Sequence, residues 1–329
     1  MEPALILPPE RDERWALARQ MGVEKAVVHP LEIGDGRTDW TFEDLLLLRN
    51  AFDDAGLEFA VMEGSVPITD RIRLGREGRD EDIETFCEFL RHCGALDVPI
   101  VAYDWMAGIR WARTSTTIPA RGDSFVTGYD DGDMRRGPDA DVAPVSADQL
   151  WEALEHFLEA AVPVAEDADV MLALHPDDPP IPEVRGVSRI IRSPEAYERV
   201  LGVVDSEHNG ITFCQGNFSA MEGVDVVDAI RRLGDRITYV HFRDVEGEGE
   251  RFVETWHDAG PTDMRAAVEA YRDVGFEGPA RPDHVPTMAG ESNANPGYET
   301  KGRLFAIGYM KGLLESAGPR GSDAGDGAP

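Results

Sequence analysis

Short apolar runs rich in β-branched residues recur along the chain, and each is followed by a segment with helical periodicity. The runs span residues 25–29, 57–64, 99–105, 169–175, 210–216, 236–244, 251–257 and 278–284. Clear helical periodicity occupies residues 41–56, 147–168 and 262–275, and Thr41 and Gly56 stand where an N-cap and a helix stop are expected. Eight strands that alternate with helices predict an α/β protein built as a single closed (β/α)8 TIM barrel.

The runner-up architecture is an open, doubly wound parallel sheet. No G-x-G-x-x-G motif follows the first apolar run, so the barrel is favoured. A chain of 329 residues is also in the usual size range of one barrel. We therefore assign residues 1–317 to one catalytic barrel domain.

Two segments depart from the alternating pattern. Residues 113–146, after the third run, are too polar for a core element and are expected to cover the active-site face of the barrel. Residues 318–329 are poor in apolar side chains and rich in glycine and aspartate, so a disordered tail is predicted there.

The chain is strongly acidic, with 63 Asp and Glu against 32 Lys and Arg and a formal net charge of −31. Such a surface repels nucleic acid and anionic membranes, so neither is expected as a partner. Because the acids are scattered rather than blocked, we interpret them as a solvated surface adapted to high salt, as in a halophile, rather than as a cation store. No apolar leader or long apolar stretch is present, which predicts a soluble, cytoplasmic protein.

Three cysteines are too few for a disulfide framework. Cys87 and Cys93 fall in a helical pattern and are expected to be small core residues. Cys214 is different, because it ends one of the apolar runs.

Polar residues stand at the ends of the apolar runs, where the chemistry of a parallel barrel is located. These residues are His29, Glu63, Asp104, His175, Cys214, His241, His257, Asp283 and His284. A single histidine at a strand end is usually a hydrogen-bonded loop residue, and Cys214 alone would be a buried thiol. Three nitrogen and sulfur donors on consecutive strands, with Asp283 across the barrel mouth, instead indicate a site for a first-row divalent metal.

Other polar residues suit a site for a polyhydroxylated acid. Arg281 and Tyr298 lie near Asp283 in sequence; an arginine pairs with a carboxylate, and a tyrosine can donate a proton to a leaving hydroxyl. Arg113 either helps to bind substrate or lies on the surface. His257 either supports the site or, like Asp263, caps a helix.

The stretch "HPDDPPIP" (175–182) follows the fourth run and is stiffened by four prolines. We interpret it as a rigid turn that holds His175 at the barrel mouth. Asp177 or Asp178 would orient the imidazole or bind a substrate hydroxyl, unless both serve the turn alone.

Several of these stretches are distinctive together. They are "ALHPDDPP" (173–180), "NGITFCQGNF" (209–218), "YVHFRDV" (239–245) and "GPARPDH" (278–284), with further stretches at 61–86, 103–115, 252–264 and 296–315. Through them the chain resembles the mannonate dehydratases, a metal-dependent family with a xylose-isomerase-like barrel. The resemblance covers most of residues 20–315.

The resemblance implies the dehydration of D-mannonate to 2-dehydro-3-deoxy-D-gluconate in hexuronate breakdown, with Mn²⁺ or Fe²⁺ as cofactor. It places the metal ligands on His175, Cys214, His241 and Asp283 and the acid/base pair on His284 and Tyr298. We expect His284 to act as the base, Tyr298 as the acid, or the reverse, and Arg281 to hold the substrate carboxylate.

Three other functions remain open at this stage. One is the dehydration of a different sugar acid. Another is a metal-dependent sugar isomerase or epimerase, but the metal sites of such enzymes usually carry carboxylates where this chain has a cysteine and two histidines. The third is a non-catalytic sugar-acid sensor, whose decayed site should lack ligands that this chain retains. A homo-oligomer is expected, as for most parallel-barrel enzymes.

Overall fold

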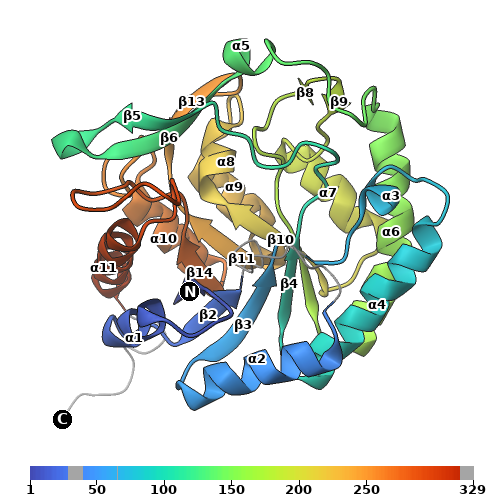
Figure 1. The fold of residues 1–329 in the computed structure, drawn as a ribbon, viewed down its shortest axis with the longest axis horizontal. Helices are drawn as coiled ribbons and strands as arrows, with labels where there is room; N and C mark the ends of the chain where they lie inside the picture. Colours follow the sequence, from blue (N-terminus) through green and yellow to red (C-terminus); the bar gives the residue numbers. More distant parts are fainter. Residues whose placement is uncertain (29–39, 65, 319–329) are drawn as a thin grey trace.

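A computed structural model of the chain describes residues 1–28, 40–64 and 66–318. Within these residues eight parallel strands close into a barrel in the order β1-β14-β11-β10-β7-β4-β3-β2 (Figure 1). Their bounds are β1 (Glu2–Leu7), β2 (Lys25–Val28), β3 (Glu58–Glu63), β4 (Ile100–Tyr103), β7 (Met171–Leu174), β10 (Asn209–Cys214), β11 (Ile237–Phe242) and β14 (Pro279–Pro282). The predicted (β/α)8 barrel is confirmed.

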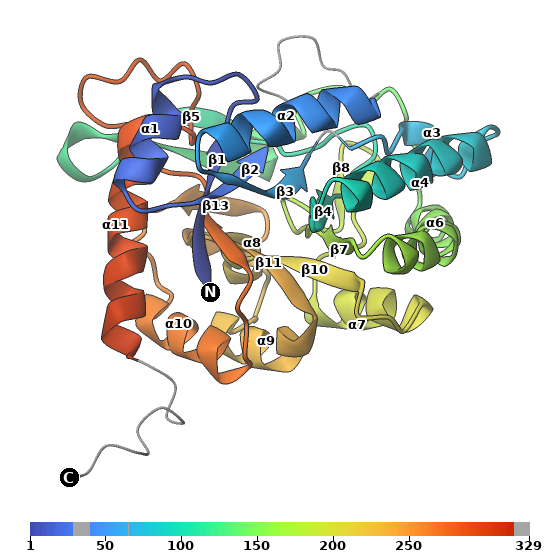
Figure 2. The ribbon, with the colours of Figure 1, turned by 90° about the horizontal axis from the view of Figure 1, so that it is seen from below.

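The helices form a ring around the strands, as Figures 1 and 2 show from two directions. The longer ones are α1 (Glu13–Gln20), α2 (Phe42–Asp54), α4 (Arg79–Ala95), α6 (Ala147–Asp167), α7 (Pro194–Val203), α9 (Val226–Leu233), α10 (Met264–Asp273) and α11 (Thr300–Ala317). The short ones are α3 (Asp70–Arg73), α5 (Asp131–Met134), α8 (Gln215–Ala220), and the 3-10 turns η2 (Arg121–Asp123) and η3 (Gly234–Arg236). Among the described helices, none is long and apolar enough to cross a membrane.

The predicted helix ends are confirmed where local chemistry specifies them. Thr41 caps α2 in a capping box with Asp44, and the chain leaves the helix at Gly56, whose φ is +68°. Asp263 caps α10 by accepting hydrogen bonds from the first backbone N–H groups. Helix α11 ends at Ala317, and almost all of the predicted tail, residues 319–329, lies outside the described residues, as does His29.

One predicted barrel strand was wrong and another was missed. Residues 251–257 do not enter the barrel: β13 (Arg251–Glu254) pairs antiparallel with β12 (Val245–Glu248) and β6 (Phe125–Asp130). In β13, buried positions alternate with more exposed ones, which is typical of a sheet with one face in solvent. The strands of a barrel enclosed by helices are instead buried on both faces. The missing barrel strand is β1, whose last four residues are all buried.

The polar segment 113–146 is more ordered than its composition indicates. It contributes β5 (Ser115–Pro119) and β6 to a four-stranded sheet of order β12-β13-β6-β5, which Figure 1 shows beside the strands of the barrel. A small hairpin of β8 (Glu183–Val184) and β9 (Val187–Ser188) lies farther along the chain. The four-stranded sheet brings Thr116 and Thr127 to the wall of a cavity at the barrel mouth, and Arg113, two residues before β5, lies at the same wall, in agreement with the expected cover.

Two apolar layers hold the barrel together. The larger one lies between the strands and the helices, and it includes Cys87 and Cys93 on α4, as predicted. The smaller one fills the barrel interior with compact side chains such as Ala4, Val61 and Ala173. These side chains fill the inside of the barrel, so its open space lies at the carboxyl ends of the strands.

Helices α4 and α6 approach each other closely at Gly94, where an added Cβ would lie 2.2 Å from the carbonyl oxygen of Ala168. We expect Gly94→Ala to lower the free energy of unfolding by about 1–3 kcal/mol through overpacking. Gly308→Ala, in the exposed face of α11 with nothing within 4 Å of the new Cβ, should raise it by about 0.5–1 kcal/mol. Urea denaturation of both variants checks this pair, and effects of the same sign would contradict the packing argument.

Candidate active site at the barrel mouth

A cavity of about 420 Å³ opens at the carboxyl ends of the barrel strands. Barrel strands and the residues that follow them supply the inner wall, the four-stranded sheet supplies a second wall, and residues 294–298 supply the third. The lining residues are Ile6, Glu63, Trp111, Arg113, Thr116, Thr127, His175, Asp178, His241, Arg281, Asp283, His284, Ala294, Asn295, Pro296 and Tyr298. Thr116 and Asn295 are exposed and therefore lie at the mouth of the cavity.

Three of the predicted metal ligands come together beneath this cavity. His175, Cys214 and His241 each offer a donor atom within 4.8 Å of the others, and all three are buried. His175 follows β7, Cys214 ends β10 and His241 is the next-to-last residue of β11. These three strands are neighbours in the barrel. The adjacency inferred from the sequence is therefore present in the structure.

The donor set fits a transition-metal ion. His175 Nδ1 lies 2.6 Å from the carbonyl oxygen of Pro176, which fixes the ring and leaves Nε2 as the donor atom. Both ring nitrogens of His241 are buried without a hydrogen bond, although Nε2 lies 3.3 Å from Glu63 Oε1 and Nδ1 lies 3.7 Å from Asp283 Oδ2. A buried thiol beside two imidazoles that retain free nitrogens can hold a first-row divalent ion.

Asp283, the fourth predicted ligand, lies at the edge of this group. Its Oδ2 is 3.7 Å from His241 Nδ1, and the carboxylate accepts from Arg281 Nη1 at 2.6 Å and Tyr298 OH at 3.1 Å. Burial alone would raise the pKa of Asp283, but Arg281 and the neighbouring cations hold it well below the usual value. Asp283 is thus an ionised carboxylate next to the three donors.

Arg281 is occupied by protein carboxylates on every side of its guanidinium. Glu63 accepts from its Nε at 3.0 Å and its Nη2 at 2.6 Å, and Asp283 takes Nη1. Glu63 also accepts from Tyr239 OH at 2.7 Å. From the sequence, Glu63 was noted only as a residue at a strand end. Its pairing with Arg281 could have been expected, because the two residues have opposite charges and stand at the ends of two predicted strands.

His284 and Tyr298 lie side by side at the cavity wall. Tyr298 OH is 3.5 Å from His284 Nε2, and Thr127 Oγ1 is 3.5 Å from Nδ1. The backbone of His284 has φ +45°, a strained conformation of the kind found at functional sites. Burial lowers the pKa of His284 well below its usual value and raises that of Tyr298 well above it, so both side chains are neutral.

Behind this pair lies a buried network of charges that includes Arg113. Arg113 Nη1 is 2.7 Å from Asp178 Oδ1, and Nη2 is 2.6 Å from Glu254 Oε1. Arg243 Nη1 lies 2.8 Å from both oxygens of Glu254, and its Nε lies 3.0 Å from Asp283 Oδ2. Burial would raise the pKa of Asp178, but Arg113 and Arg243 hold it below its usual value. Arg113 therefore belongs to the site rather than to the surface.

Sequence reasoning missed Glu254, Arg243 and Asn217. Arg243 Nη2 donates to Oδ1 of Asn217, the residue directly after Gly216, at 2.6 Å. An added Cβ at Gly216 would lie 2.6 Å from Arg243 Nη1, so the arginine fits only because position 216 has no side chain. The arginine two residues after His241 was a visible signal, whereas Glu254 was concealed by the wrong strand assignment.

Asp177 and His257 lie outside the cavity lining. Asp177 Oδ2 accepts the backbone N–H groups of Ile190 and Ile191, both at 2.7 Å, and so anchors the proline-rich turn. His257 is fully buried, and its Nε2 lies 2.8 Å from the carbonyl oxygen of Phe242. Of the two aspartates in the turn, Asp178 is the one that lines the cavity.

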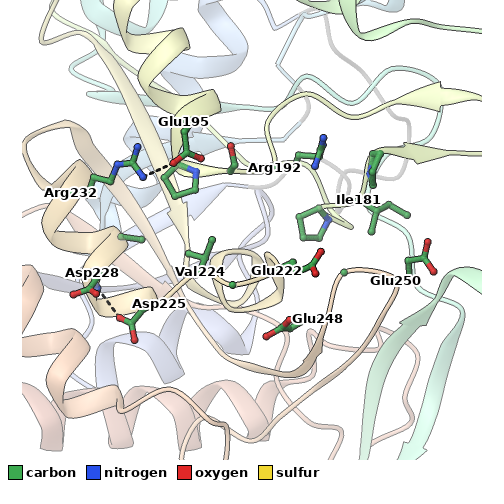
Figure 3. Close-up of a pocket in the computed structure, with 17 residues that line it drawn as sticks. Ile181, Arg192, Glu195, Glu222, Val224, Asp225, Asp228, Arg232, Glu248 and Glu250 are labelled. Carbon is green, nitrogen blue, oxygen red and sulfur yellow. Dashed lines mark hydrogen bonds and ion pairs between the residues drawn. The ribbon is translucent and has the colours of Figure 1, made fainter.

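A larger groove of about 960 Å³ lies between α7, α9 and the turn that joins β12 to β13 (Figure 3). Its charged lining is Arg192, Glu195, Glu222, Asp225, Asp228, Arg232, Glu248 and Glu250, and none of its lining residues is a histidine or cysteine. Two of the acids serve the fold, because Glu195 pairs with Arg232 at 2.6 Å and Asp225 caps α9 (Figure 3). We therefore place the active site in the smaller cavity.

Comparison with known proteins decides the family. A family model described as D-mannonate dehydratase (UxuA) matches residues 14–143 and 139–320. The mannonate dehydratase of Streptococcus suis (strain 05ZYH33) is 33% identical over 339 aligned residues, which cover 94% of this chain and 90% of that protein. This chain belongs to the mannonate dehydratase family.

Solved structures agree with this family. The crystal structure of mannonate dehydratase from Streptococcus suis serotype 2 matches with a TM-score of 0.87 and 31% identity, covering 100% of this chain and 97% of that one. A xylose isomerase domain protein from Planctomyces limnophilus, at a TM-score of 0.60 and 15% identity over 96% of this chain and 97% of that one, shares the fold alone. The predicted mannonate dehydratase family and xylose-isomerase-like barrel are confirmed, whereas these comparisons give no support to a halophilic origin.

The buried His257 makes this mannonate dehydratase family member sensitive to acid. Burial lowers the pKa of His257 from 6.5 to about 4, so the unfolded chain binds this proton more readily. The contribution of the neutral His257 to the free energy of unfolding is complete above pH 6.5 and is lost as the pH falls toward 4. Between pH 7 and pH 5 we expect the wild type to lose about 2 kcal/mol more unfolding free energy than His257→Gln. Urea denaturation at the two pH values measures this, and parallel losses would contradict it.

Proposed function

We propose that this protein removes water from D-mannonate to give 2-dehydro-3-deoxy-D-gluconate, as a hydro-lyase. Family membership over nearly the whole chain supports the reaction class. The observation that carries the proposal is the placement of the His284–Tyr298 pair in the same cavity as His175 and His241. A cavity of about 420 Å³ is in the size range of small-molecule sites.

His175, Cys214 and His241 would hold a divalent metal ion, with Asp283 as the proposed fourth ligand. The thiolate, imidazole and carboxylate donors suit Mn²⁺ or Fe²⁺. When bound, the ion supplies Lewis acidity to the carboxylate and hydroxyl oxygens of the substrate.

The chain's own residues move the protons. His284 is neutral and accepts the proton from C2 of the sugar acid, and Tyr298 donates its phenolic proton to the hydroxyl that leaves C3. The C3 oxygen departs as water, and the resulting enol gives the 2-keto acid. Asp283 accepts a hydrogen bond from Tyr298 at 3.1 Å and so fixes the position of the phenol.

Arg281 takes a positioning role in this proposal rather than the substrate-binding role expected from the sequence. All of its hydrogen-bond donors face Glu63, Asp283 or the Pro282 carbonyl oxygen. Arg113 also lines the cavity, where it contributes a positive charge toward a bound acid while its Nη atoms pair with Asp178 and Glu254. Asp178 would hold Arg113 in place.

The remaining expectations stay predictions. They are a cytoplasmic location, a homo-oligomeric assembly, the absence of nucleic-acid and membrane partners, and activity in high salt. His257 supports the backbone next to His241 rather than contacting the substrate in this proposal.

The first test is anaerobic turnover of D-mannonate in molar salt with Mn²⁺ or Fe²⁺, following the 2-keto-3-deoxy acid. We expect product with the wild type and a loss of at least about 100-fold in His175→Ala, together with a lower bound-metal stoichiometry. His156→Ala, on the surface of α6, is the matched control and should behave as wild type. Full turnover or full metal content in His175→Ala would contradict the ligand assignment.

A second test separates the two proton transfers by exchange in D₂O. Tyr298→Phe should lose dehydration by about 10²–10⁴-fold and still exchange the C2 proton of mannonate, because His284 remains. His284→Asn should lose both activities. Mass spectrometry of the recovered mannonate detects the exchange. If Tyr298→Phe abolishes exchange and His284→Asn retains it, the two roles are reversed.

A further inference from the structure

Glu254 is a buried carboxylate that the proposed proton transfers do not use. It ends β13, in the four-stranded sheet rather than the barrel, and its side chain is 1% exposed. Its Oε1 faces Arg113 and Arg243, and the same oxygen lies 3.8 Å from His284 Nδ1. A charge so deeply buried is expensive to keep unless its position matters.

The two nitrogens of His284 have different neighbours. The nearest protein group to Nε2 is Arg113 Nη2 at 3.3 Å, and a guanidinium can only donate. Tyr298 OH, at 3.5 Å from Nε2, directs its proton toward Asp283. On the other side, Nδ1 lies 3.5 Å from Thr127 Oγ1, a hydroxyl that can donate or accept and so selects neither tautomer. It also lies 3.8 Å from the Glu254 carboxylate, which when ionised can only accept.

These neighbours select one tautomer of the neutral imidazole. Arg113 Nη2 also faces Asp178 and Glu254, so its effect on His284 is mainly that of its positive charge. A positive charge beside Nε2 favours a lone pair there, and a negative charge beside Nδ1 favours a proton there. Asp283 Oδ2 also lies 3.8 Å from Nε2, but this oxygen is 3.0 Å from Arg243 Nε and the Arg113 donor is closer to the ring. The arrangement therefore favours a proton on Nδ1 and a free lone pair on Nε2, on the side of Tyr298.

We propose that Glu254 is a positioning residue that holds His284 as the Nδ1–H tautomer, so that Nε2 is the atom that accepts the substrate proton. The role of His284 as the base rests on the proposed function, whereas the assignment of its tautomer rests only on the groups around the ring. The distance of 3.8 Å exceeds a hydrogen bond, and such contacts in ligand-free enzymes commonly shorten when substrate binds. Gly297 leaves room for the ring, because an added Cβ there would lie 3.0 Å from Nδ1.

The substitution Glu254→Gln tests the tautomer directly. The carboxamide removes the negative charge beside Nδ1 and replaces one acceptor oxygen with an N–H group, which weakens the preference for a proton on Nδ1. Glu254→Asp keeps an acceptor-only group and is the conservative variant. Glu246→Gln, an exposed glutamate on β12 of the same hairpin, is the matched control.

Two readouts are needed. In steady-state assays Glu254→Gln should lower kcat about 100-fold with KM changed less than about threefold, and Glu254→Asp should recover part of kcat. Glu246→Gln should match the wild type. In metal-free protein carrying ¹⁵N-labelled histidine, long-range ¹H–¹⁵N correlation should show Nδ1–H for His284 in the wild type and a larger share of Nε2–H in Glu254→Gln. The chain has 8 histidines, and loss of a signal in His284→Asn assigns the ring.

An Nε2–H tautomer in the wild type, or the same proportion of the two tautomers in wild type and Glu254→Gln, would overturn the proposal. A fall in kcat that comes with an equal loss of substrate affinity and thermal stability, and with no recovery in Glu254→Asp, would also overturn it and leave a purely structural role. The spectroscopic arm is independent of turnover. Failure of the wild type to dehydrate mannonate would therefore defeat the proposed reaction without deciding the role of Glu254.

Discussion

The site depends on guanidinium and carboxylate groups that are buried together at the barrel mouth. Arg281 joins Glu63 on β3 to Asp283 after β14, and Arg243 joins Asp283 to Glu254 in the four-stranded sheet. Removing such charges from water costs several kcal/mol per ion, so pairs of this kind rarely add net stability. Their effect here is geometric, because each arginine fixes carboxylates from elements far apart in the sequence.

The same network sets the electrostatic sign of the cavity. Four carboxylates, those of Glu63, Asp178, Glu254 and Asp283, face three guanidinium groups, those of Arg113, Arg243 and Arg281. The protein groups alone therefore leave a negative excess next to a cavity proposed for an anion. A cation held by two imidazoles and a thiol would reverse that excess locally, which connects the donor set to the choice of a sugar acid as substrate.

Strand-end reasoning could predict the site to the extent that barrel topology determines it. His175, Cys214 and His241 follow neighbouring strands, so their meeting needed only the strand order. The contributions of the four-stranded sheet were not predictable, because its register decides which side of β13 faces the barrel. Glu254 was missed because residues 251–257 were assigned to the barrel, and β1 was missed because Pro3 lies within it and Pro8 follows it directly. Asp177 and Asp178 are adjacent and chemically identical, and only the backbone path of the turn separates an anchor from a cavity wall.

The close approach of Gly216 and Arg243 has a consequence for anyone who would redesign this enzyme. A methyl group at position 216 would collide with the arginine on which Glu254 and Asp283 both depend, so this glycine is closed to mutational libraries even though it touches no substrate in the proposed reaction. Thr116 and Asn295 stand at the open rim, where a change of side chain disturbs no buried charge. Altered preference among aldonic acids should be sought at the rim, where diversity is tolerated, while residue 216 stays glycine.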